Sequence, residues 1–594
     1  MDTKVVNKSQ VKNALKIPGI PGNIAAALTM RIAGFDKLNE IYSHVADYQG
    51  IEFIDKLLEH LGITYSVNSD WEEQIPKSGK LLIVANHPFG GLDGMLALKI
   101  LSSVRPDIKV LTNLFVAQIP NIKEYFYSVN TTYGFGRIVA NYSSGLHQGE
   151  EYLNNGGVLV VFPSGEVSSL NKKEKITEDG EWQQYVSKIA KRTQAQIVPL
   201  LFDGENSWYF HFLQKISVKL SDWRLPKELS NKKGKDIKVR IGAPINLKDL
   251  TIFKDDREIA KYLRSRTYAL EATLDEVNSP VKNAKPITPH IDKEILAKEI
   301  AANENCLLFK VGSYSSYLFD YEQIPNIIKE IGICREEAFR DVGEGTGNEI
   351  DLDEFDPHYK HLLLWDNEKD LLIGAYRLGL GADIIEKQGI KGFYSDMFFR
   401  FNPNMTSTLK ECIELGRSFV SVGYQKDTMA LLFLLKGLFY ATMKFTEYKH
   451  LIGPVSISSW YPMLYRSLMF HYLKNSASTP KFANMVNPLT PFIPNTGRVD
   501  IDILIKGRME SLEAFDRYMY RVSGGKYRFP TLVKKYLKLG SKIIDYNVDP
   551  DFNDCLDCLI MLTLSDIPTD DVDSFCREFE DHRPIYKRFY GNDL

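Results

Sequence analysis

The chain has 594 residues, with 73 Lys and Arg against 76 Asp and Glu, and a formal net charge of −3. Apolar residues make up 44% and aromatic residues 12%, which is enough for several buried cores and excludes a disordered or collagen-like chain. The near-neutral charge argues against nucleic acid as a main partner, because such proteins need a basic face to bind phosphates.

The cysteines and the N-terminus bear on the compartment. Six cysteines, all after residue 300, are too few for a disulfide framework and predict a reducing environment. The start MDTKVVNKSQ has no apolar signal-peptide core, and no window reaches the ~18–20 apolar residues that span a bilayer. We therefore expect a cytoplasmic protein, peripheral on the inner face of the cytoplasmic membrane. The amphipathic stretch NIAAALTMRIAGFDKL fits either a membrane interface or packing on the first domain.

The first half of the chain predicts an α/β domain. Residues 1–70 have helical spacing of apolar residues and are expected to pack on a domain spanning residues 71–280. Buried strands are predicted in that domain at LLIVA, IKVLTNL, GVLVVF, AQIVPLLF and IKVRIGAPI, with helical stretches among them. This alternation predicts a largely parallel sheet. Residues 281–305, in a Pro- and Lys-rich region, are expected to form a linker.

The second half predicts a different sheet. In residues 306–540, a helix and a polar Gly/Asp-rich loop precede the strands YKHLLLWDN and LLIGAYRLGL, and the strand CIELGRSFV leads to a long apolar helix. Adjacent strands joined by a short turn are antiparallel, so a mixed α/β sheet is expected. Residues 541–594 are expected to form a helical tail.

A candidate catalytic pair lies at the end of the first buried strand, in VANHPFGGLDG. Ligands of α/β sheets bind at the carboxyl ends of strands, which is where His87 is expected. A neutral imidazole can take a proton from a substrate hydroxyl, and Asp93 would orient the ring and stabilise the imidazolium. This pair suits acyl transfer from a thioester to an alcohol. The alternative is a histidine that only caps the turn.

The blocks NHPFGGLDG, FPSGEVS, IVPL and DGENSWYF resemble glycerolipid and lysophospholipid acyltransferases, especially the bacterial ornithine-lipid O-acyltransferase and hemolysin branch, over about residues 20–250. The resemblance implies that His87 is the general base and Asp93 its partner. It also implies an acceptor-binding group: Phe162, Pro163, Ser164, Gly165, Glu166 and Asn206.

Two features depart from that family. Five residues separate His87 from Asp93, where the family has four, and the flexible pair Gly90-Gly91 can absorb one of them. The family's Phe-Pro-Glu-Gly-Thr-Arg block reads FPSGEVS here, without the arginine for an acceptor phosphate. An acidic Glu166 in its place suggests an amine-bearing or zwitterionic lipid acceptor.

The C-terminal half resembles ornithine-lipid N-acyltransferases, which share the Gcn5-related fold with acyl-homoserine-lactone synthases, over about residues 307–470. The matching residues are Arg335, Phe339, Asp353, Asp356, Arg377, Glu414 and Arg417. Any one of them alone is as well explained by a structural ion pair or a solvated loop.

This resemblance implies N-acylation of an amino acid. Glu414 would accept the proton of the amine. Arg377 and Arg417 would bind the amino acid's carboxylate or anchor Glu414. Asp353 and Asp356 would hold the N-terminal segment over the site and meet the amine.

The donor is expected to be acyl carrier protein. Acetyl-CoA-using relatives cradle pyrophosphate in a Gly-rich loop before a helix, whereas SVGYQKDT at that place has one glycine. GEGTG, from Gly343, precedes the strands and is expected to be a flexible lid. No cofactor and no metal are expected, since Cys555 and Cys558 form a lone CxxC, which is more often two cysteines on one helical turn than a zinc site.

Together these features predict a bifunctional ornithine lipid synthase. The C-terminal domain would N-acylate ornithine with a 3-hydroxyacyl group from acyl carrier protein, and the N-terminal domain would O-acylate that hydroxyl. Thus His87→Ala should accumulate the mono-acyl lipid, and Glu414→Ala or Arg417→Ala should abolish both products. Glycine or another amino acid as acceptor stays open, as do a lysophospholipid acyltransferase, alone or paired with an autoinducer-type synthase, and a membrane-binding hemolysin that is no enzyme.

Overall fold

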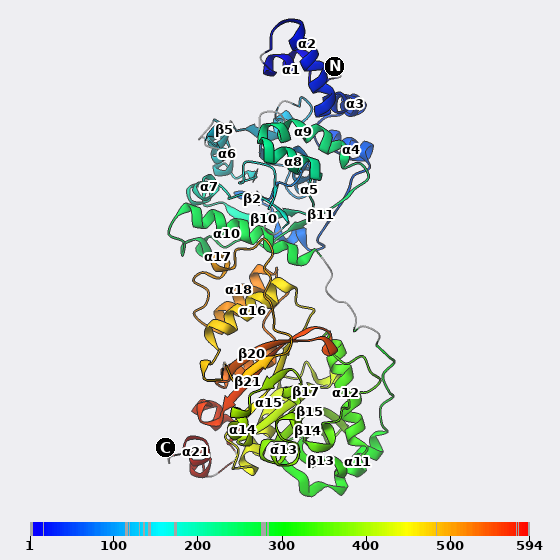
Figure 1. Ribbon diagram of the computed structural model, residues 1–594, viewed down its shortest axis with the longest axis vertical. Helices are drawn as coiled ribbons and strands as arrows, with labels where there is room; N and C mark the ends of the chain where they lie inside the picture. The colour runs from blue at the N-terminus through cyan, green and yellow to red at the C-terminus, as the bar shows by residue number, and fades with distance from the viewer. Residues whose placement is uncertain are drawn as a thin grey trace. The chain divides into compact units, whose positions relative to one another are not determined.

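The computed structural model describes residues 4–15, 17–112, 117, 119–129, 131–134, 137–140, 144–171, 175–274, 281, 284–482, 484–577, 579 and 581–591. The chain forms two compact units (Figure 1). Unit 1 contains Met1–Asp275 and Thr496–Tyr527, and unit 2 contains Glu276–Asn495 and Arg528–Leu594.

Unit 1 is built on a seven-stranded sheet with the order β1-β11-β10-β2-β7-β3-β4. Neighbouring strands are parallel except for the antiparallel pair β10–β11, so the predicted, largely parallel sheet is confirmed. Every residue of β2 is buried, as in a strand covered on both faces. The strands are β1 (Thr64–Val67), β2 (Leu81–Ala85), β3 (Ile108–Thr112), β4 (Phe126–Ser128), β5 (Thr131–Gly134), β6 (Arg137–Ala140), β7 (Val158–Val161), β8 (Ser169–Leu170), β9 (Thr177–Glu178), β10 (Gln196–Phe202) and β11 (Asp236–Ile241).

Four helices begin the chain, as the apolar spacing predicts, and the strand β1 follows them within the segment expected to be helical. In the second of these helices the exposed and buried residues separate onto different faces. The helices of unit 1 are α1 (Lys8–Leu15), α2 (Gly19–Ala33), α3 (Phe35–Val45), α4 (Gly50–Leu61), α5 (Gly91–Leu101), α6 (Ser144–Asn154), α7 (Tyr185–Thr193), α8 (Trp208–Ile216), α9 (Val218–Asn231), α10 (Asp256–Tyr268), α17 (Ile501–Ile505) and α18 (Leu512–Val522). Among the described residues, no helix has the length and apolar character needed to cross a bilayer.

Unit 2 is built on an eight-stranded sheet with the order β12-β13-β14-β15-β17-β18-β21-β20. Only the pair β17–β18 is parallel among these neighbours, which confirms a mixed sheet. The strands of unit 2 are β12 (Leu307–Val311), β13 (Tyr314–Asp320), β14 (Lys360–Asp366), β15 (Leu371–Leu380), β16 (Phe399–Phe401), β17 (Cys412–Val420), β18 (His450–Ile457), β19 (Val486–Pro488), β20 (Lys542–Asp549) and β21 (Cys555–Thr563).

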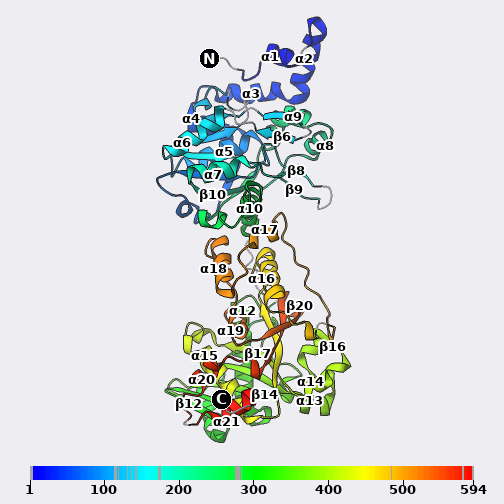
Figure 2. The ribbon, with the colours of Figure 1, turned by 90° about the vertical axis from the view of Figure 1, so that its left-hand side faces the viewer.

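Helices cover both faces of this sheet (Figure 2). Ala375 packs in a core with the helix α12, while a side chain on the adjacent Gly374 would meet Leu434 of α15. Successive residues of a strand point to opposite faces, so α12 and α15 lie on opposite sides. The helices of unit 2 are α11 (Lys293–Ala302), α12 (Ile327–Asp341), α13 (Gly381–Gln388), α14 (Thr406–Lys410), α15 (Thr428–Lys444), α16 (Met463–Ser476), α19 (Thr531–Lys538), α20 (Thr569–Phe575) and α21 (Arg583–Tyr590).

The parallel strands β17 and β18 separate before they end. Their pairing stops at Glu414↔Ile452, although the strands continue to Val420 and Ile457. The backbone groups beyond that point face a gap in the sheet, which is where a ligand can enter between two strands.

The expected helical tail at residues 541–594 is corrected. Strands β20 and β21 complete the large sheet, and only α20 and α21 are helical there. The stretch CLDCLIMLT is buried on both faces, so it shows no alternation that would distinguish a strand from a helix. Cys555 and Cys558 therefore lie on a strand rather than on one helical turn.

Two further segments differ from the expected organisation. Residues 496–527 pack with unit 1, although they lie in the stretch assigned to the C-terminal domain. Part of the predicted linker, 281–305, forms α11, whose Leu296 and Ile300 enter a core of unit 2. Residues 282 and 283 of that linker lie outside the described residues.

Candidate active sites

The first site is the predicted pair at the end of β2. His87 Nδ1 lies 2.9 Å from Oδ2 of Asp93, and the His87 side chain is 16% exposed while Asp93 is fully buried. The structure thus brings together the two residues that the sequence proposes as a dyad. A ring whose Nδ1 faces a carboxylate presents Nε2 as the group that can take a proton.

The turn between these residues absorbs the extra residue. Gly90 has φ 85°, a conformation that favours glycine, and is the N-cap residue directly before α5. Asp93 Oδ2 accepts hydrogen bonds from the amides of Phe89 and Gly90, at 2.9 and 3.0 Å. Burial raises the pKa of the Asp93 carboxyl, and His87 and these amides partly offset that rise. Asp93 is therefore both a helix cap and the partner of His87.

The FPSGE block lies against the dyad. The Phe162 ring stacks on His87 with centroids 4.3 Å apart. Gly165 has φ 73°, and Ser164 Oγ donates to the carbonyl of Glu166 at 2.7 Å, so the block forms a tight turn. Pro163 presents its carbonyl to the amide of Gln183. Burial raises the pKa of Glu166, and repulsion from the nearby carboxylates of Asp222 and Asp179 raises it further.

Asp179 holds the histidine loop and was missed by the sequence analysis. Its Oδ1 accepts from the amide of His87 at 3.1 Å and from Ser168 Oγ at 2.6 Å. Its Oδ2 accepts from Trp182 Nε1 at 2.9 Å, and the residue is 2% exposed. Asp179 lies 92 residues after His87, and no motif in the sequence indicates this long-range contact.

Asn206 lies in the loop after β10 and is 3% exposed. Neither polar atom of its amide has a partner among the residues that the structure describes. On either side of it, the Glu205 carbonyl accepts from Lys232 Nζ at 2.6 Å and Ser207 Oγ donates to Glu228. A buried amide without partners is costly in an empty site, and a bound polar ligand would satisfy it.

An apolar cavity of about 300 Å³ opens beside the start of α5. Phe89 and Gly91, within four residues of His87, form part of its wall. Side chains of α3, α4 and α9 complete it, among them Tyr42, Leu57 and Trp223. The dyad thus lies next to a space suited to a hydrocarbon chain.

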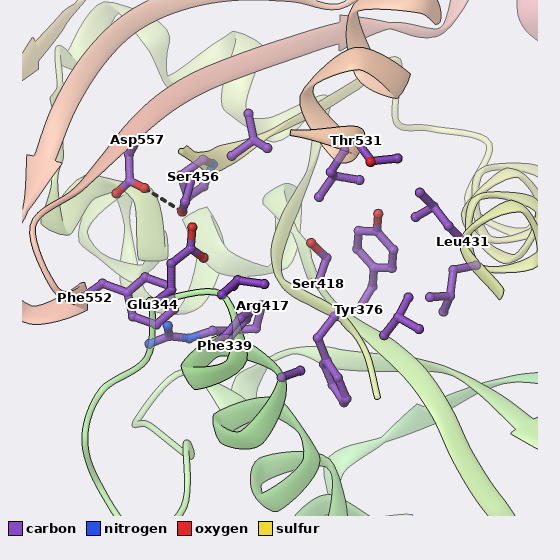
Figure 3. A pocket seen from close by; sticks show the side chains of 18 of the residues that line it. Phe339, Glu344, Tyr376, Arg417, Ser418, Leu431, Ser456, Thr531, Phe552 and Asp557 are labelled. Carbon is purple, nitrogen blue, oxygen red and sulfur yellow. Dashed lines mark hydrogen bonds between the residues drawn. The ribbon is translucent and has the colours of Figure 1, made fainter. Parts of the chain in front are cut away.

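The second site is a cleft of about 380 Å³ in unit 2, where β17 and β18 separate (Figure 3). Arg417–Val420 of β17 and Pro454–Ser456 of β18 line it. One part is apolar, with Phe419, Val420, Leu431 and Leu434, and another part carries acidic side chains and Arg417. A thioester-linked acyl chain and a polar acceptor can therefore meet in the same cleft.

Three predicted residues form a buried network instead of lining this cleft. Arg335, Arg377 and Asp356 are each about 1% exposed. Both terminal nitrogens of Arg335 contact Asp356, at 3.2 and 3.1 Å, and Arg377 Nη1 contacts it at 3.2 Å. Burial alone would raise the pKa of Asp356, but the two arginines lower it well below its usual range. Asp351, which the sequence analysis missed, completes the network 3.0 Å from Arg335 Nε.

Three other predicted residues reach the cavities. Phe339 and Arg417 line the cleft, and Asp353 lines an adjoining cavity of about 450 Å³ together with Arg417. Arg417 lies between the rings of Tyr394 and Phe552, at 5.1 and 5.3 Å. Its Nη2 is 3.4 Å from Asp353, and its Nε has no partner among the described residues.

The backbone at Arg417 is strained. Its φ of 50° lies in the left-handed region, where β17 carries a bulge against β15. A non-glycine residue in that conformation costs about 1–3 kcal/mol, and such strain is concentrated at functional sites. Arg417 is thus directed toward the cleft from a strand whose regular pleat would not place it there.

Glu414 is buried away from the cleft. Its carboxylate accepts from Tyr359 Oη and from the amides of Tyr394 and Ser395, and it is not exposed. Burial raises its pKa, and these hydrogen bonds lower it. Glu414 lines neither cavity described above, so its predicted role as proton acceptor stays a prediction.

Three acids that the sequence analysis missed do line the cleft: Glu344, Asp549 and Asp557. Burial raises the pKa of Glu344 to about 8, with a further contribution from Asp557. Burial also raises the pKa of Asp557 to about 7, with a contribution from Asp549. Glu344 lies in the GEGTG loop, and Asp557 in the CLDC stretch that was expected to be helical.

Loops around the cleft depart from phosphate-binding geometry. Glu336 accepts from the amides of Thr346 and Gly347, at 3.1 and 2.9 Å, so the GEGTG loop is anchored rather than a flexible lid. The N-terminus of α15 is capped by Asp427, whose carboxylate accepts from the amide of Met429 at 2.8 Å. A carboxylate at this position repels the pyrophosphate that a free helix N-terminus would attract.

Comparisons with known proteins match the two halves of the chain to different acyltransferases. Residues 12–277 match a family model described as acyltransferase, and residues 334–435 match one described as acetyltransferase (GNAT) domain. A glycine N(alpha)-acyltransferase of Bacteroides thetaiotaomicron is 28% identical over 294 residues, 47% of this chain and 86% of that protein. A lyso-glycine lipid O-acyltransferase of Phocaeicola vulgatus is 24% identical over 247 residues, 40% of this chain and 83% of that protein.

A solved structure is also similar, the 1-acyl-sn-glycerophosphate acyltransferase PlsC from Thermotoga maritima. It is 17% identical, covers 40% of this chain and 84% of its own, and has a TM-score of 0.23. The two family models and the curated relatives show that the chain is an acyltransferase, with an acyltransferase domain followed by a GNAT domain. The predicted α/β fold class, the two domain types and the enzyme class are confirmed.

Proposed function

We propose that this chain makes an acylated amino acid lipid in two consecutive steps. The GNAT domain transfers a 3-hydroxyacyl group to the amine of an amino acid, and the N-terminal domain then acylates the hydroxyl of that acyl chain. The observation that carries the proposal is the presence, on one chain, of similarity to a glycine N(alpha)-acyltransferase and to a lyso-glycine lipid O-acyltransferase. A fused pair keeps the amphiphilic intermediate at a high effective concentration.

The O-acylation step uses His87 as general base. Its Nε2 takes the proton of the acceptor hydroxyl, whose oxygen attacks the thioester carbon, and the same proton then passes to the departing sulfur. Asp93, 2.9 Å from Nδ1, stabilises the imidazolium that exists between these transfers. The adjacent apolar cavity would receive an acyl chain.

Glycine is the acceptor best supported for the first step. The names of both curated relatives, the N(alpha)-acyltransferase and the lyso-lipid O-acyltransferase, specify glycine. The sequence favours ornithine partly because Glu166 suits an amine-bearing lipid, but burial raises the pKa of Glu166. A shift in that direction weakens the case for a side-chain ammonium at Glu166, so ornithine is the second candidate.

We propose acyl carrier protein as the donor, in place of a soluble coenzyme A thioester. The support is the Asp427 cap on α15, which leaves no open helix N-terminus for pyrophosphate at the expected place. A carrier protein delivers its acyl group on a phosphopantetheine arm, which carries no pyrophosphate. No cofactor or metal enters this proposal.

We also propose that unit 1 binds the cytoplasmic face of a membrane. In α2, Ile20, Ile24, Leu28 and Ile32 form a stripe at four-residue spacing, each between 58% and 74% exposed. Arg224 of α9, beside α8 (Figure 1), connects this stripe to the exposed aromatic face of α8, because it donates to the carbonyl of Ile32 and stacks on Tyr209. A basic group between apolar side chains suits an anionic lipid surface.

We propose a reducing cytoplasm as the compartment, and the support is the state of the thiols. All six cysteines are free and buried, which is the state expected in a reducing cytoplasm.

The function is tested by expressing the full chain in a bacterial host that makes no amino acid lipids. Lipid extracts are analysed by mass spectrometry for N-acylglycine and N-acylornithine, each with and without a second acyl chain. A new di-acylated glycine lipid is expected. New di-acylated ornithine lipid without the glycine lipid would reverse the order of acceptors. Parallel cultures are grown with labelled glycerol phosphate. If the only new lipids in them are phospholipids, the proposal is contradicted.

A further inference from the structure

The acidic side of the GNAT cleft has no partner for its charge. Glu344 is 9% exposed and Asp557 is 3% exposed, and both line the cavity (Figure 3). The Glu344 carboxylate has no hydrogen bond or ion pair among the described residues. Burying a carboxylate without a partner is costly, so such groups are retained where a ligand completes them.

Asp557 is held in a fixed orientation. It pairs across the strands with Ser456, whose hydroxyl donates to Oδ1 at 2.8 Å, and Cys555 Sγ lies 3.4 Å from the same oxygen. Oδ2 has no partner in the part of the chain that the structure describes. One oxygen is thus anchored to the sheet, and the other is available to a ligand in the cleft.

A cation would complement these carboxylates. The described residues of the cleft do not bring together the three ligand atoms that a metal ion would need. Among the described residues, only His290, Glu330 and Cys334 bring three ligand atoms of this kind within 4.8 Å of one another, and they lie outside the cleft. Arg417, the cation of the cleft, is already near Asp351 and Asp353. An organic ammonium needs only one or two acceptors, which the cleft provides.

We propose that Asp557 and Glu344 bind the ammonium group of the amino acid acceptor, and that Asp557 accepts its proton. Arg417 binds the carboxylate of the same molecule through Nε, at the boundary of the two cavities. This inference rests on the proposed N-acylation. It assigns the proton acceptor to β21 and the GEGTG loop instead of Glu414.

The reaction balances with these groups. The ammonium gives one proton to Asp557, and the neutral nitrogen attacks the thioester carbon. The C–N bond forms and the C–S bond breaks, and the second proton of the nitrogen leaves with the sulfur as a thiol. Asp557 then releases its proton to water, so the cycle needs no further reactant.

The charge of the pair also selects the acceptor. At about pH 7.5, midway between the pKa values of about 8 for Glu344 and about 7 for Asp557, the two carboxyls together hold about one proton. The pair then carries close to one negative charge and matches one ammonium. Glycine meets this requirement, whereas ornithine brings a second cation.

The pH dependence follows from the surroundings of Asp557. Facing it are Glu344, Asp549 of β20, the Cys555 thiol, the Ser456 hydroxyl and Arg417. The carboxylate must be ionised to take a proton, so kcat/KM for glycine should fall as the pH decreases through about 7.

The test uses the full chain with an acyl carrier protein thioester and glycine. For Asp557→Asn we expect a loss of about 10²–10⁴-fold in kcat/KM. The decrease of kcat/KM below about pH 7 should also disappear from the pH profile. For Glu344→Gln we expect KM for glycine to rise about 10-fold, because a charge-assisted contact is removed. KM for the donor and O-acylation of added N-(3-hydroxyacyl)glycine should stay unchanged, which shows that the variants are folded.

The matched control is Asp545→Asn. Asp545 lies on β20, and burial raises its pKa as well, but it does not line the cleft. It should retain wild-type kinetics. If the wild-type protein acylates no amino acid, the proposed function fails. Two other results would overturn only the assignment of Asp557, provided that the wild-type protein acylates glycine. One is a kcat/KM of Asp557→Asn within about threefold of the wild-type value. The other is a wild-type kcat/KM that does not decrease below about pH 7.

Discussion

Replacing Asp93 by Asn separates the two roles of this residue. The Asn Oδ1 can still accept from the amides of Phe89 and Gly90, which lie 2.9 and 3.0 Å from Oδ2 in the wild-type protein. The same oxygen also faces His87 Nδ1 at 2.9 Å in the wild-type protein, so an Asn oxygen in its place keeps this contact and loses only the negative charge. Without that charge the imidazolium formed during proton transfer is not stabilised, and His87 becomes a weaker base.

The expected loss of O-acylation is therefore large, while the loss of stability is small. General-base catalysis contributes about 10²–10⁴-fold in rate, and His87 without the Asp93 charge should lose most of that contribution. Both backbone hydrogen bonds persist, so the free energy of unfolding should change by less than about 1 kcal/mol. By contrast, Asp93→Ala leaves two buried amides without acceptors and should cost about 2–6 kcal/mol.

The pH dependence of stability has a definite sign. Burial raises the pKa of Asp93 in the folded protein, so its folding contribution is fully present below the unfolded pKa and is lost as the pH rises through the raised value. The Asn side chain does not titrate, so the variant does not lose this stability as the pH rises. Its stability relative to the wild-type protein should therefore increase from acid toward neutral pH.

The assay measures acyl transfer to the hydroxyl of N-(3-hydroxyacyl)glycine at fixed pH, with urea denaturation of the same samples. Asp249→Asn is the control, since Asp249 is 6% exposed and pairs with Arg508 at 3.0 Å, away from His87. It should lose stability and keep O-acylation. Asp93→Asn with wild-type O-acylation would refute the dyad, and N-acylation in the same preparation shows that the rest of the chain is intact.

Three further predictions concern residues with other roles. Arg335→Leu should lower the free energy of unfolding by about 3–5 kcal/mol in urea, because it removes Arg335 from the buried carboxylates Asp351 and Asp356 and leaves each with one arginine contact; a change below about 1 kcal/mol would show that the network is dispensable. Glu414→Gln should keep N-acylation within about tenfold of the wild-type rate, because its carboxylate is bound to Tyr359 and backbone amides rather than facing the cleft, and a loss as large as that of Asp557→Asn would restore it as the proton acceptor. Ile24→Glu combined with Trp208→Glu should abolish sedimentation with anionic vesicles while leaving N-acylation intact, and undiminished sedimentation would contradict the membrane surface.

The fold was predictable where short-range pattern and function coincide. The buried strand β2 and its His87 turn follow directly from an apolar run, a glycine pair and the strand-end rule. The resemblance also identified Asp93, although its spacing from His87 is one residue longer than in the family. The positive φ of Gly90 lets the turn accommodate that additional residue. The mixed sheet of unit 2 likewise followed from a short turn between two strands.

The rest depends on contacts between distant parts of the chain. Asp179 reaches His87 across 92 residues, and no local pattern carries that information. Asp557 was hidden because a strand buried on both faces has the composition of a core helix. Glu414 and Arg417 are three residues apart in one motif, yet a bulge sends only Arg417 to the cleft.

The return of residues 496–527 to unit 1 has a consequence for how this protein arose and can be dissected. Lys506 is 2.6 Å from Glu258, and Tyr518 donates to the carbonyl of Leu504 while lying 3.3 Å from Tyr262. A fragment that stops at residue 275 loses all of these stabilising partners. The N-terminal acyltransferase domain is therefore not a portable fragment of the first 275 residues, because a segment from the later half of the chain completes its packing.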